Sequence, residues 1–206
     1  MPSIQRIPGL GERRGRRKTP LAVSLALALV AGVIAWEKER AAAPSSTISH
    51  PEGWQVFFSP NGGCTNAVVA ELGSAKSSVL VQAYSFTSGP IAKALADAKR
   101  RGVEVRVLLD KSQRSERYTS ADFIAHAGIP VLIDDKHAIA HNKVMVIDAD
   151  TVITGSFNFT KAAETGNAEN LLIIRGAKEL ARQYGDNWAR HRQHSVAYPL
   201  DENNGR

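Results

Sequence analysis

The chain has 206 residues, of which 26 are Lys or Arg and 20 are Asp or Glu, so its formal net charge is +6. Residues 1–18 hold six of the basic residues and one acidic residue; the remainder has 20 basic and 19 acidic residues, a net charge of +1, so charge alone does not indicate a nucleic-acid-binding face there. The single cysteine, Cys64, excludes an intrachain disulfide and a cysteine-based zinc finger, and we expect a buried thiol.

The first 43 residues have the pattern of a targeting segment rather than of a folded domain. The basic stretch 1–18 precedes an uncharged, largely apolar run over residues 21–36. This order is typical of a signal peptide or of a single N-terminal membrane anchor, and about sixteen residues are marginal for a spanning helix. Cleavage after Ala35 and retention as an anchor are both open. In either case we expect the basic flank to stay inside and the rest of the chain to be exported.

The rest of the chain predicts one α/β domain over residues 54–195, after a linker over 44–53 and before a C-terminal tail over 196–206. Apolar, β-branched runs alternate with helical stretches that end near glycine. Strands are predicted over 55–59, 78–83, 103–109, 131–133, 143–148, 151–154 and 170–174, and helices over 64–75, 90–101, 120–127 and 177–194. The alternation favours a mixed, largely parallel sheet flanked by helices on both faces.

Two side chains suited to phosphate chemistry stand at the start of one predicted strand. His141 and Lys143 adjoin the apolar run that leads to Ile147. Two residues apart on an extended chain, they project to the same face. An imidazole acts as base or acid near neutral pH, and an ammonium group is a point charge for phosphate oxygens. The pair therefore suits reaction at a phosphodiester.

A second predicted strand returns from a turn at Asp150 and ends in the sequence GSFN, close to His141. Gly155 permits close approach of the backbone, while Ser156 and Asn158 offer neutral hydrogen bonds to phosphate oxygens. We therefore expect a hairpin that carries its polar groups at one edge.

The whole stretch, HNKVMVIDADTVITGSFNFT, combines the spacing H-x-K-x4-D with a following G-S-x-N. This resembles the HKD signature of the phospholipase D superfamily. The resemblance covers roughly residues 54–188, and phrases such as GSFNFTKAAE and AENLLII are similar to its small, single-motif bacterial endonucleases. It implies a phospholipase D-like fold with one HKD motif per chain, and catalysis through a covalent phosphohistidine with no metal ion and no cofactor.

The resemblance implies catalytic or substrate-binding roles for six residues: His141, Lys143, Asp148, Glu169, Ser156 and Asn158. His141 is the nucleophile or the proton donor, and Lys143 with Asn158 forms the phosphate clamp. Ser156 is a further phosphate contact, and Glu169 resembles the carboxylate that holds the histidine ring. Asp148 completes the motif, and we expect it to be structural at the strand end.

The implied reaction needs two histidines, but the chain has one motif. The remaining histidines lack a Lys two residues later; these are His50, His126, His137, His191 and His194. We therefore expect a homodimer across a two-fold axis, to which each chain contributes one His141 and one Lys143.

Other polar residues have simpler interpretations. The loop from Lys111 to Arg117 follows a strand, and whether it binds substrate is open. His137 is interpreted as a surface histidine. His191 and His194 lie on the predicted last helix without a carboxylate or cysteine at ligand spacing, so we expect no metal site there.

The leading prediction is an endonuclease that cleaves DNA, with RNA as a further candidate substrate. The alternative is a phospholipase D-type hydrolase of phospholipid head groups. A membrane tether through residues 21–36 favours this alternative, whereas the sequence shows no long apolar lid that would cover a lipid. A non-catalytic binding module is disfavoured because His141, Lys143 and Asn158 are all present. The expected location is outside a bacterial cytoplasm, either periplasmic or anchored in the inner membrane with the catalytic domain outside.

Overall fold

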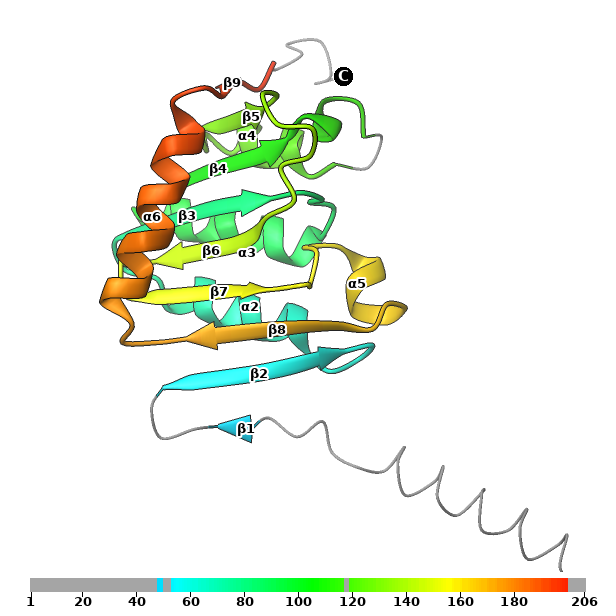
Figure 1. The fold of residues 1–206 in the computed structure, drawn as a ribbon, viewed down its shortest axis with the longest axis vertical. Coiled ribbons are helices and arrows are strands. Elements are labelled where there is room, and N and C mark those ends of the chain that lie inside the picture. The colour runs from blue at the N-terminus through cyan, green and yellow to red at the C-terminus, as the bar shows by residue number, and fades with distance from the viewer. Residues whose placement is uncertain (1–47, 50–52, 117–118, 200–206) are drawn as a thin grey trace, which may run out of the picture. The chain divides into compact units, whose positions relative to one another are not determined.

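A computed structural model describes residues 48–49, 53–116 and 119–199 (Figure 1). The predicted leader, residues 1–43, and its apolar run lie outside these ranges, as does most of the predicted linker. Among the described residues, no helix has both the length and the apolar character needed to span a bilayer.

One mixed sheet forms the centre of the domain, with the strand order β1-β2-β8-β7-β6-β3-β4-β5-β9. Its strands are β1 (Ile48–Ser49), β2 (Trp54–Ser59), β3 (Ser78–Ala83), β4 (Glu104–Asp110), β5 (Val131–Asp134), β6 (Lys143–Ile147), β7 (Thr151–Gly155), β8 (Glu169–Ile174) and β9 (Val196–Ala197). β3 pairs in parallel with β4, and β4 with β5, whereas the other pairs in the described sheet are antiparallel.

The predicted mixed sheet is confirmed, but its parallel part is smaller than expected. Parallel neighbours need a crossover connection, and the segments after β3 and β4 provide one. The later strands β6 and β7 are joined by a turn at residues 148–150, so they pair antiparallel. The sheet also extends into both flanking segments, because β1 lies in the predicted linker and β9 in the predicted tail.

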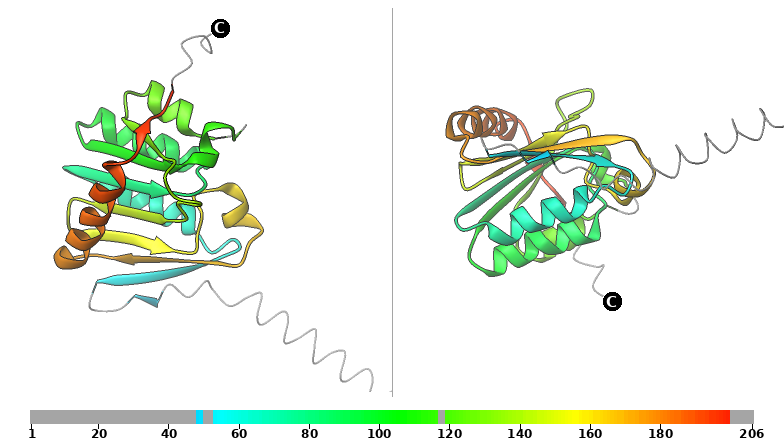
Figure 2. Two further views of the ribbon diagram at one scale, coloured as in Figure 1. Left: turned by 45° about the horizontal axis from the view of Figure 1, so that its top comes forward. Right: turned by 90° about the horizontal axis from the view of Figure 1, so that it is seen from below.

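Helices cover both faces of the sheet, as predicted (Figures 1 and 2). One face carries α2 (Cys64–Ser74), α3 (Gly89–Arg100) and α4 (Ala121–His126), and the other carries α6 (Lys178–Arg192). The short helix α5 (Lys161–Thr165) and the 3-10 turn η1 (Lys111–Arg114) lie at the edge of the sheet on the right of Figure 1.

The strand alternation of β6 divides its side chains between two apolar cores. Met145 and Ile147 join the larger core beneath α2, α3 and α4, and Val144 and Val146 join a smaller one beneath α6. Cys64 is buried in the larger core, as expected, and burial raises the pKa of its thiol to about 11. Both faces of β6 are thus packed, which holds its first residue rigidly in place.

The ends of several strands meet at the edge of the sheet that carries α5. Ala83 pairs with both Leu109 and Lys143, so β3 and β4 end where β6 begins. The antiparallel partner β7 ends at the same edge with Gly155. The loops that follow β3, β4, β5 and β7 therefore lie around the start of β6, a usual place for a ligand site in an α/β sheet.

Candidate active site

Lys143 opens β6 and is 6% exposed. Its Nζ donates a hydrogen bond to the backbone oxygen of His141 (2.9 Å) and lies 5.0 Å from the centroid of the Tyr84 ring. Burial lowers the pKa of Lys143 below its ordinary value, against the smaller raising effect of the charge on Glu169. A buried ammonium with one backbone acceptor is a strong attractor for an anion.

His141 precedes β6 and is exposed. Its ring packs against the ring of Tyr84 with centroids 4.6 Å apart, and the Tyr84 amide donates to the carbonyl of Asn142 (2.8 Å). Within the described residues, neither ring nitrogen of His141 makes a hydrogen bond. The imidazole is therefore positioned by packing, while both nitrogens stay available for chemistry.

The end of β7 is tied closely to β8. The amides of Ser156 and Phe157 both donate to the carbonyl of Asn170 (3.1 Å each), and the Ser156 hydroxyl accepts from the Asn170 amide (3.0 Å). Gly155 has a φ of 140°, and a Cβ there would lie 2.3 Å from the Asn170 carbonyl oxygen. Only glycine fits this approach, which explains the first residue of the G-S-x-N sequence.

Asn158 is held between two fully buried phenylalanines, Phe157 and Phe159. Phe159 bridges to Phe86 in the segment after β3, which brings that segment to the site. The Oδ1 of Asn158 is buried without a hydrogen-bond partner in the described residues. An unpaired buried amide atom is costly, and such costs are typical of ligand sites.

Glu169 begins β8 at the same edge of the sheet, where its charge acts on Lys143. Its Oε1 accepts a hydrogen bond from the Asn167 side chain (3.0 Å). In the described residues it makes no hydrogen bond to His141, whose ring packs against Tyr84 instead.

Asp148 lies at the opposite end of β6, in the turn to β7. Its carboxylate accepts hydrogen bonds from the amides of Lys76 (2.9 Å), Ser77 (2.7 Å) and Ser78 (3.0 Å), and from the Ser77 hydroxyl (2.9 Å). Partial burial by itself raises the pKa of Asp148, but the hydrogen bonds outweigh it and hold the pKa below its usual value. Its position favours the structural role, because the whole length of β6 separates it from His141 and Lys143.

Five of the six predicted site residues therefore gather at one edge, and two further residues position them. Tyr84 follows β3 and contacts the side chains of both His141 and Lys143. Asp110, at the end of β4, is buried, and its carboxylate accepts from the Ala140 amide (2.7 Å), which anchors the loop before His141. Sequence reasoning missed both, because each acts through a contact far along the chain.

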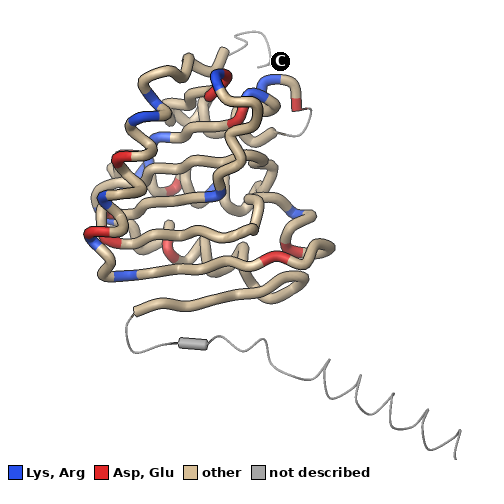
Figure 3. Tube along the Cα trace, in the orientation of Figure 1, with Lys and Arg blue, Asp and Glu red and all other residues tan. Residues whose placement is uncertain are grey.

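The loop that starts at Lys111 does reach this edge of the sheet, but its basic residues are partly engaged. The Nζ of Lys111 donates to the carbonyl of His137 (3.0 Å), and Arg114 pairs with Asp135 (2.9 Å). Arg117 lies outside the described residues. Basic and acidic positions are interspersed over the described domain (Figure 3), in line with its near-neutral charge.

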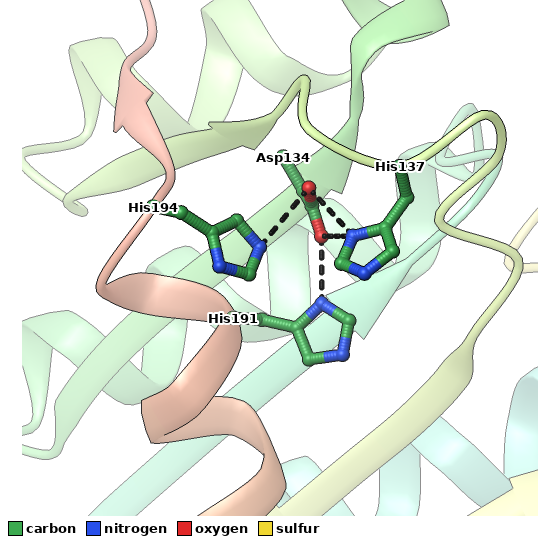
Figure 4. Close-up of side chains that lie close together, drawn as sticks. All are labelled: Asp134, His137, His191 and His194. Carbon is green, nitrogen blue, oxygen red and sulfur yellow. Dashed lines mark hydrogen bonds and ion pairs between the residues drawn. The ribbon is translucent and has the colours of Figure 1, made fainter.

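A cluster of three histidines, apart from His141, surrounds Asp134, the last residue of β5 (Figure 4). His137, His191 and His194 all point at its carboxylate. Burial by itself raises the pKa of Asp134, but these contacts, His191 first, lower it to about 2. The prediction that His191 and His194 have no carboxylate at ligand spacing is therefore wrong, because folding brings Asp134 next to both. The helix also ends at Arg192 rather than at 194, which lets His194 turn toward Asp134.

The chain matches less than two thirds of the length of its curated relatives. Residues 68–192 match a family model described as cardiolipin synthase, PLD-like domain. A protein called phospholipase D from Rickettsia felis is 45% identical over 131 residues, which cover 64% of this chain and 65% of that protein. A mitochondrial cardiolipin hydrolase from Chlamydomonas reinhardtii is 32% identical over 110 residues, which cover 53% of this chain and 49% of that protein.

The fold also matches nearly the full length of one solved structure. Nuc from Salmonella typhimurium, described as a phospholipase D family member, superposes with a TM-score of 0.69 and 41% sequence identity. The match covers 71% of this chain and 97% of that one. The predicted α/β architecture is therefore confirmed by the sheet itself and by a related structure.

Proposed function

Since this chain belongs to the phospholipase D superfamily through its PLD-like domain, we propose that it is a metal-independent phosphodiesterase, and specifically an endonuclease that cleaves DNA, with RNA as a second candidate substrate. The observation that carries the proposal is that His141, whose ring makes no hydrogen bond within the described residues, lies beside the buried ammonium of Lys143, both against the ring of Tyr84. Asn158 and Ser156 lie at the same edge of the sheet and offer neutral contacts to phosphate oxygens.

The proposed reaction proceeds by two displacements at phosphorus. A nitrogen of one His141 attacks phosphorus and forms a phosphohistidine, while a second histidine gives its proton to the departing oxygen. That second histidine then removes a proton from water, the water oxygen attacks phosphorus, and the first histidine leaves. Lys143 stabilises the charge on the equatorial oxygens throughout, so the chemistry calls for no metal ion.

The second histidine is proposed to come from another copy of this chain. Of the other histidines in the described part, His126 bonds to the carbonyl of Asp122, and the remaining three surround Asp134. None of these is a free imidazole beside His141. A two-fold dimer would bring two His141–Lys143 pairs together, because an isologous contact repeats the same groups on both sides.

Nucleic acid is favoured over lipid by the phrases GSFNFTKAAE and AENLLII, which are similar to the single-motif bacterial endonucleases. Phospholipid is the second candidate, since the Rickettsia felis and Chlamydomonas reinhardtii relatives carry names of lipid hydrolases. Both substrates present a phosphodiester, so the site chemistry is the same for the two.

The test uses the full chain with supercoiled plasmid in excess EDTA, beside the variant His141→Asn. We expect nicking that survives chelation and falls by at least about 10⁴-fold in the variant, since it removes the nucleophile. Vesicles of phosphatidylcholine or of cardiolipin are incubated in parallel. Head-group release with intact plasmid would move the assignment to the phospholipase, and EDTA-sensitive nicking would contradict the proposed mechanism.

The dimer is tested with two differently tagged chains, one of them carrying His141→Asn, purified as the mixed dimer through both tags. If one reaction needs both histidines, the mixed dimer retains less than about 1% of the activity of the unsubstituted dimer. Half of the activity would mean that each chain works alone and would overturn the shared site.

We also propose that the domain is exported, either released after cleavage near Ala35 or tethered through residues 21–36. Cell fractionation, with N-terminal sequencing of the mature chain, separates the two cases. Recovery of the intact chain in the cytoplasm would contradict export.

A further inference from the structure

We propose that Asp134, His137, His191 and His194 bind a divalent transition-metal ion, with Zn²⁺ as the best fit, and that this ion stabilises the fold beside the active site. The four residues lie outside the proposed phosphodiesterase site. They form the group in the described residues whose donor atoms, one from each side chain, all lie within 4.8 Å of one another.

The cluster is built around a fully buried carboxylate. Asp134 is 0% exposed and sits at the end of β5. Its Oδ2 lies 2.6 Å from Nδ1 of His191 and 3.0 Å from Nδ1 of His137, and its Oδ1 lies 3.3 Å from Nε2 of His194. The three rings point inward from different segments (Figure 4), and their centroids are 4.8 to 5.5 Å apart.

Hydrogen bonds alone satisfy this cluster poorly. The buried Nε2 of His194 has no well-directed hydrogen-bond partner among the described residues, although it faces Asp134. A divalent cation would give this nitrogen a partner, because neutral imidazoles direct their lone pairs at the ion and the carboxylate offsets part of its charge.

The donor set selects the kind of ion. Three imidazole nitrogens and one carboxylate oxygen suit Zn²⁺ and its first-row neighbours, whereas Ca²⁺ and Mg²⁺ prefer oxygen ligands throughout. A tetrahedral Zn²⁺ with bonds of about 2.0–2.1 Å places its ligand atoms roughly 3.4 Å apart. The contacts of Asp134 are close to that spacing, so side-chain shifts on the order of 1 Å would complete the site.

The spacing of the four residues along the sequence also fits a metal site. Asp134 and His137 are separated by two residues, as are His191 and His194, and the two pairs are far apart along the chain. Two short-spaced ligand pairs from distant segments are typical of structural zinc sites, which use four protein ligands. With four protein ligands, the proposed ion would have a structural role rather than a catalytic one.

The position of the cluster indicates what the ion would stabilise. His137 lies in the loop that leads from β5 to His141, and its carbonyl accepts from Lys111. His191 lies on the last turn of α6, and His194 follows it before β9. An ion would cross-link β5, the loop before the active site and the C-terminal segment. Asp134 and His191, which it would join, are 57 residues apart in the sequence.

The test begins with the full chain stripped of metal by EDTA and dialysed. Titration with ZnCl₂ is expected to show one bound ion per chain by mass spectrometry of the metal. The melting temperature should rise by about 5–10 °C when free Zn²⁺ is a hundred times its Kd. Co²⁺ in place of Zn²⁺ should give the visible absorption of a four-coordinate site with nitrogen ligands.

His137→Ala and the double variant His191→Ala/His194→Ala are the tests of location, and His126→Ala is the matched control. His137 is an exposed loop residue, so its variant should fold, bind Zn²⁺ at least about 100-fold more weakly and lose the Zn²⁺-dependent rise in melting temperature. The His126→Ala chain should behave as the unsubstituted one. A stripped chain that takes up no Zn²⁺, or a His137→Ala chain that binds it unchanged, would overturn the site.

The test of the Zn²⁺ site can succeed or fail whether or not the chain is an endonuclease. Plasmid nicking in EDTA at low temperature should continue while the melting temperature falls, because the proposed catalysis uses no metal. A chain that binds Zn²⁺ but nicks no plasmid would uphold the metal site and contradict the endonuclease.

Discussion

The two ends of strand β6 carry the two halves of one sequence motif, but their polar groups are satisfied very differently. At the start, the imidazole of His141 has no hydrogen bond within the described residues, and Lys143 is buried with one backbone acceptor. At the other end, the carboxylate of Asp148 accepts hydrogen bonds from four donor groups of residues 76–78. The start of β6, here called the open end, is therefore suited to a ligand, whereas the Asp148 end, called the saturated end, is suited to stability.

The largest expected effect is on catalysis, at the open end. Lys143→Met should lower turnover of the phosphodiester substrate by about 10³-fold, because the charge on the phosphate oxygens loses its stabilising ammonium. Its free energy of unfolding should stay the same or rise, since a buried charge is replaced by an apolar side chain. Turnover and urea unfolding measure the two effects.

An exposed lysine is the control for this variant. Lys178→Met, at the start of α6, should change neither quantity. Unchanged turnover in the Lys143→Met chain would remove the basis for treating the start of β6 as the phosphate site.

The next effect concerns the backbone beside the open end. Gly155→Ala should destabilise the domain by about 2–4 kcal/mol, because its Cβ would meet the Asn170 carbonyl oxygen at 2.3 Å and its φ is 140°. Turnover should fall with it, since Ser156 would shift. Gly185→Ala is the control: a Cβ there meets nothing within 4 Å, and in α6 it should be neutral or stabilising. Equal unfolding midpoints for the two variants would contradict the close approach at Gly155.

The third effect concerns stability at the saturated end. Asp148→Asn should lower the free energy of unfolding by roughly 2 kcal/mol at neutral pH and leave turnover within about two-fold, because charged hydrogen bonds to three amides are weakened. A loss of turnover in a folded Asp148→Asn chain would move this residue back into the reaction.

The same variant predicts a pH dependence. The pKa of Asp148 is lower in the folded chain than the usual value of about 3.9, so its contribution to stability is present above that pH and is lost as the pH falls toward the folded pKa. The difference in unfolding free energy between the two chains should therefore shrink below about pH 4. Urea unfolding at pH 7 and pH 3 measures it, and a difference that grows in acid would contradict the assignment.

The smallest expected effect is at Tyr84, whose ring contacts both His141 and the Nζ of Lys143. Tyr84→Leu should lower turnover by about five- to ten-fold, the equivalent of roughly 1 kcal/mol for a lost ring contact. Tyr84→Phe keeps the ring and should stay close to the unsubstituted chain. A larger loss in the Phe variant would point to the hydroxyl rather than to packing.

Much of the site could be predicted because it is local. His141, Lys143, Ser156 and Asn158 lie on one hairpin, and the two-residue period of strands together with a short turn is enough to bring them to one edge. The predicted strand over 143–148 differs from β6 by one residue, and the predicted helix over 90–101 differs from α3 by one at each end. Local periodicity and turn residues determine such elements.

The tertiary structure decided what depends on distant neighbours. The pairing of β1 and β9 with the sheet, the limited parallel part, and the contacts of Tyr84 and Asp110 with the active-site loop all join segments that no local pattern relates. The Asp134 cluster is the clearest case. Its two pairs of residues lie far apart along the chain, and they meet because α6 packs across the sheet and ends beside β5. This is a result of the whole core rather than of any one segment.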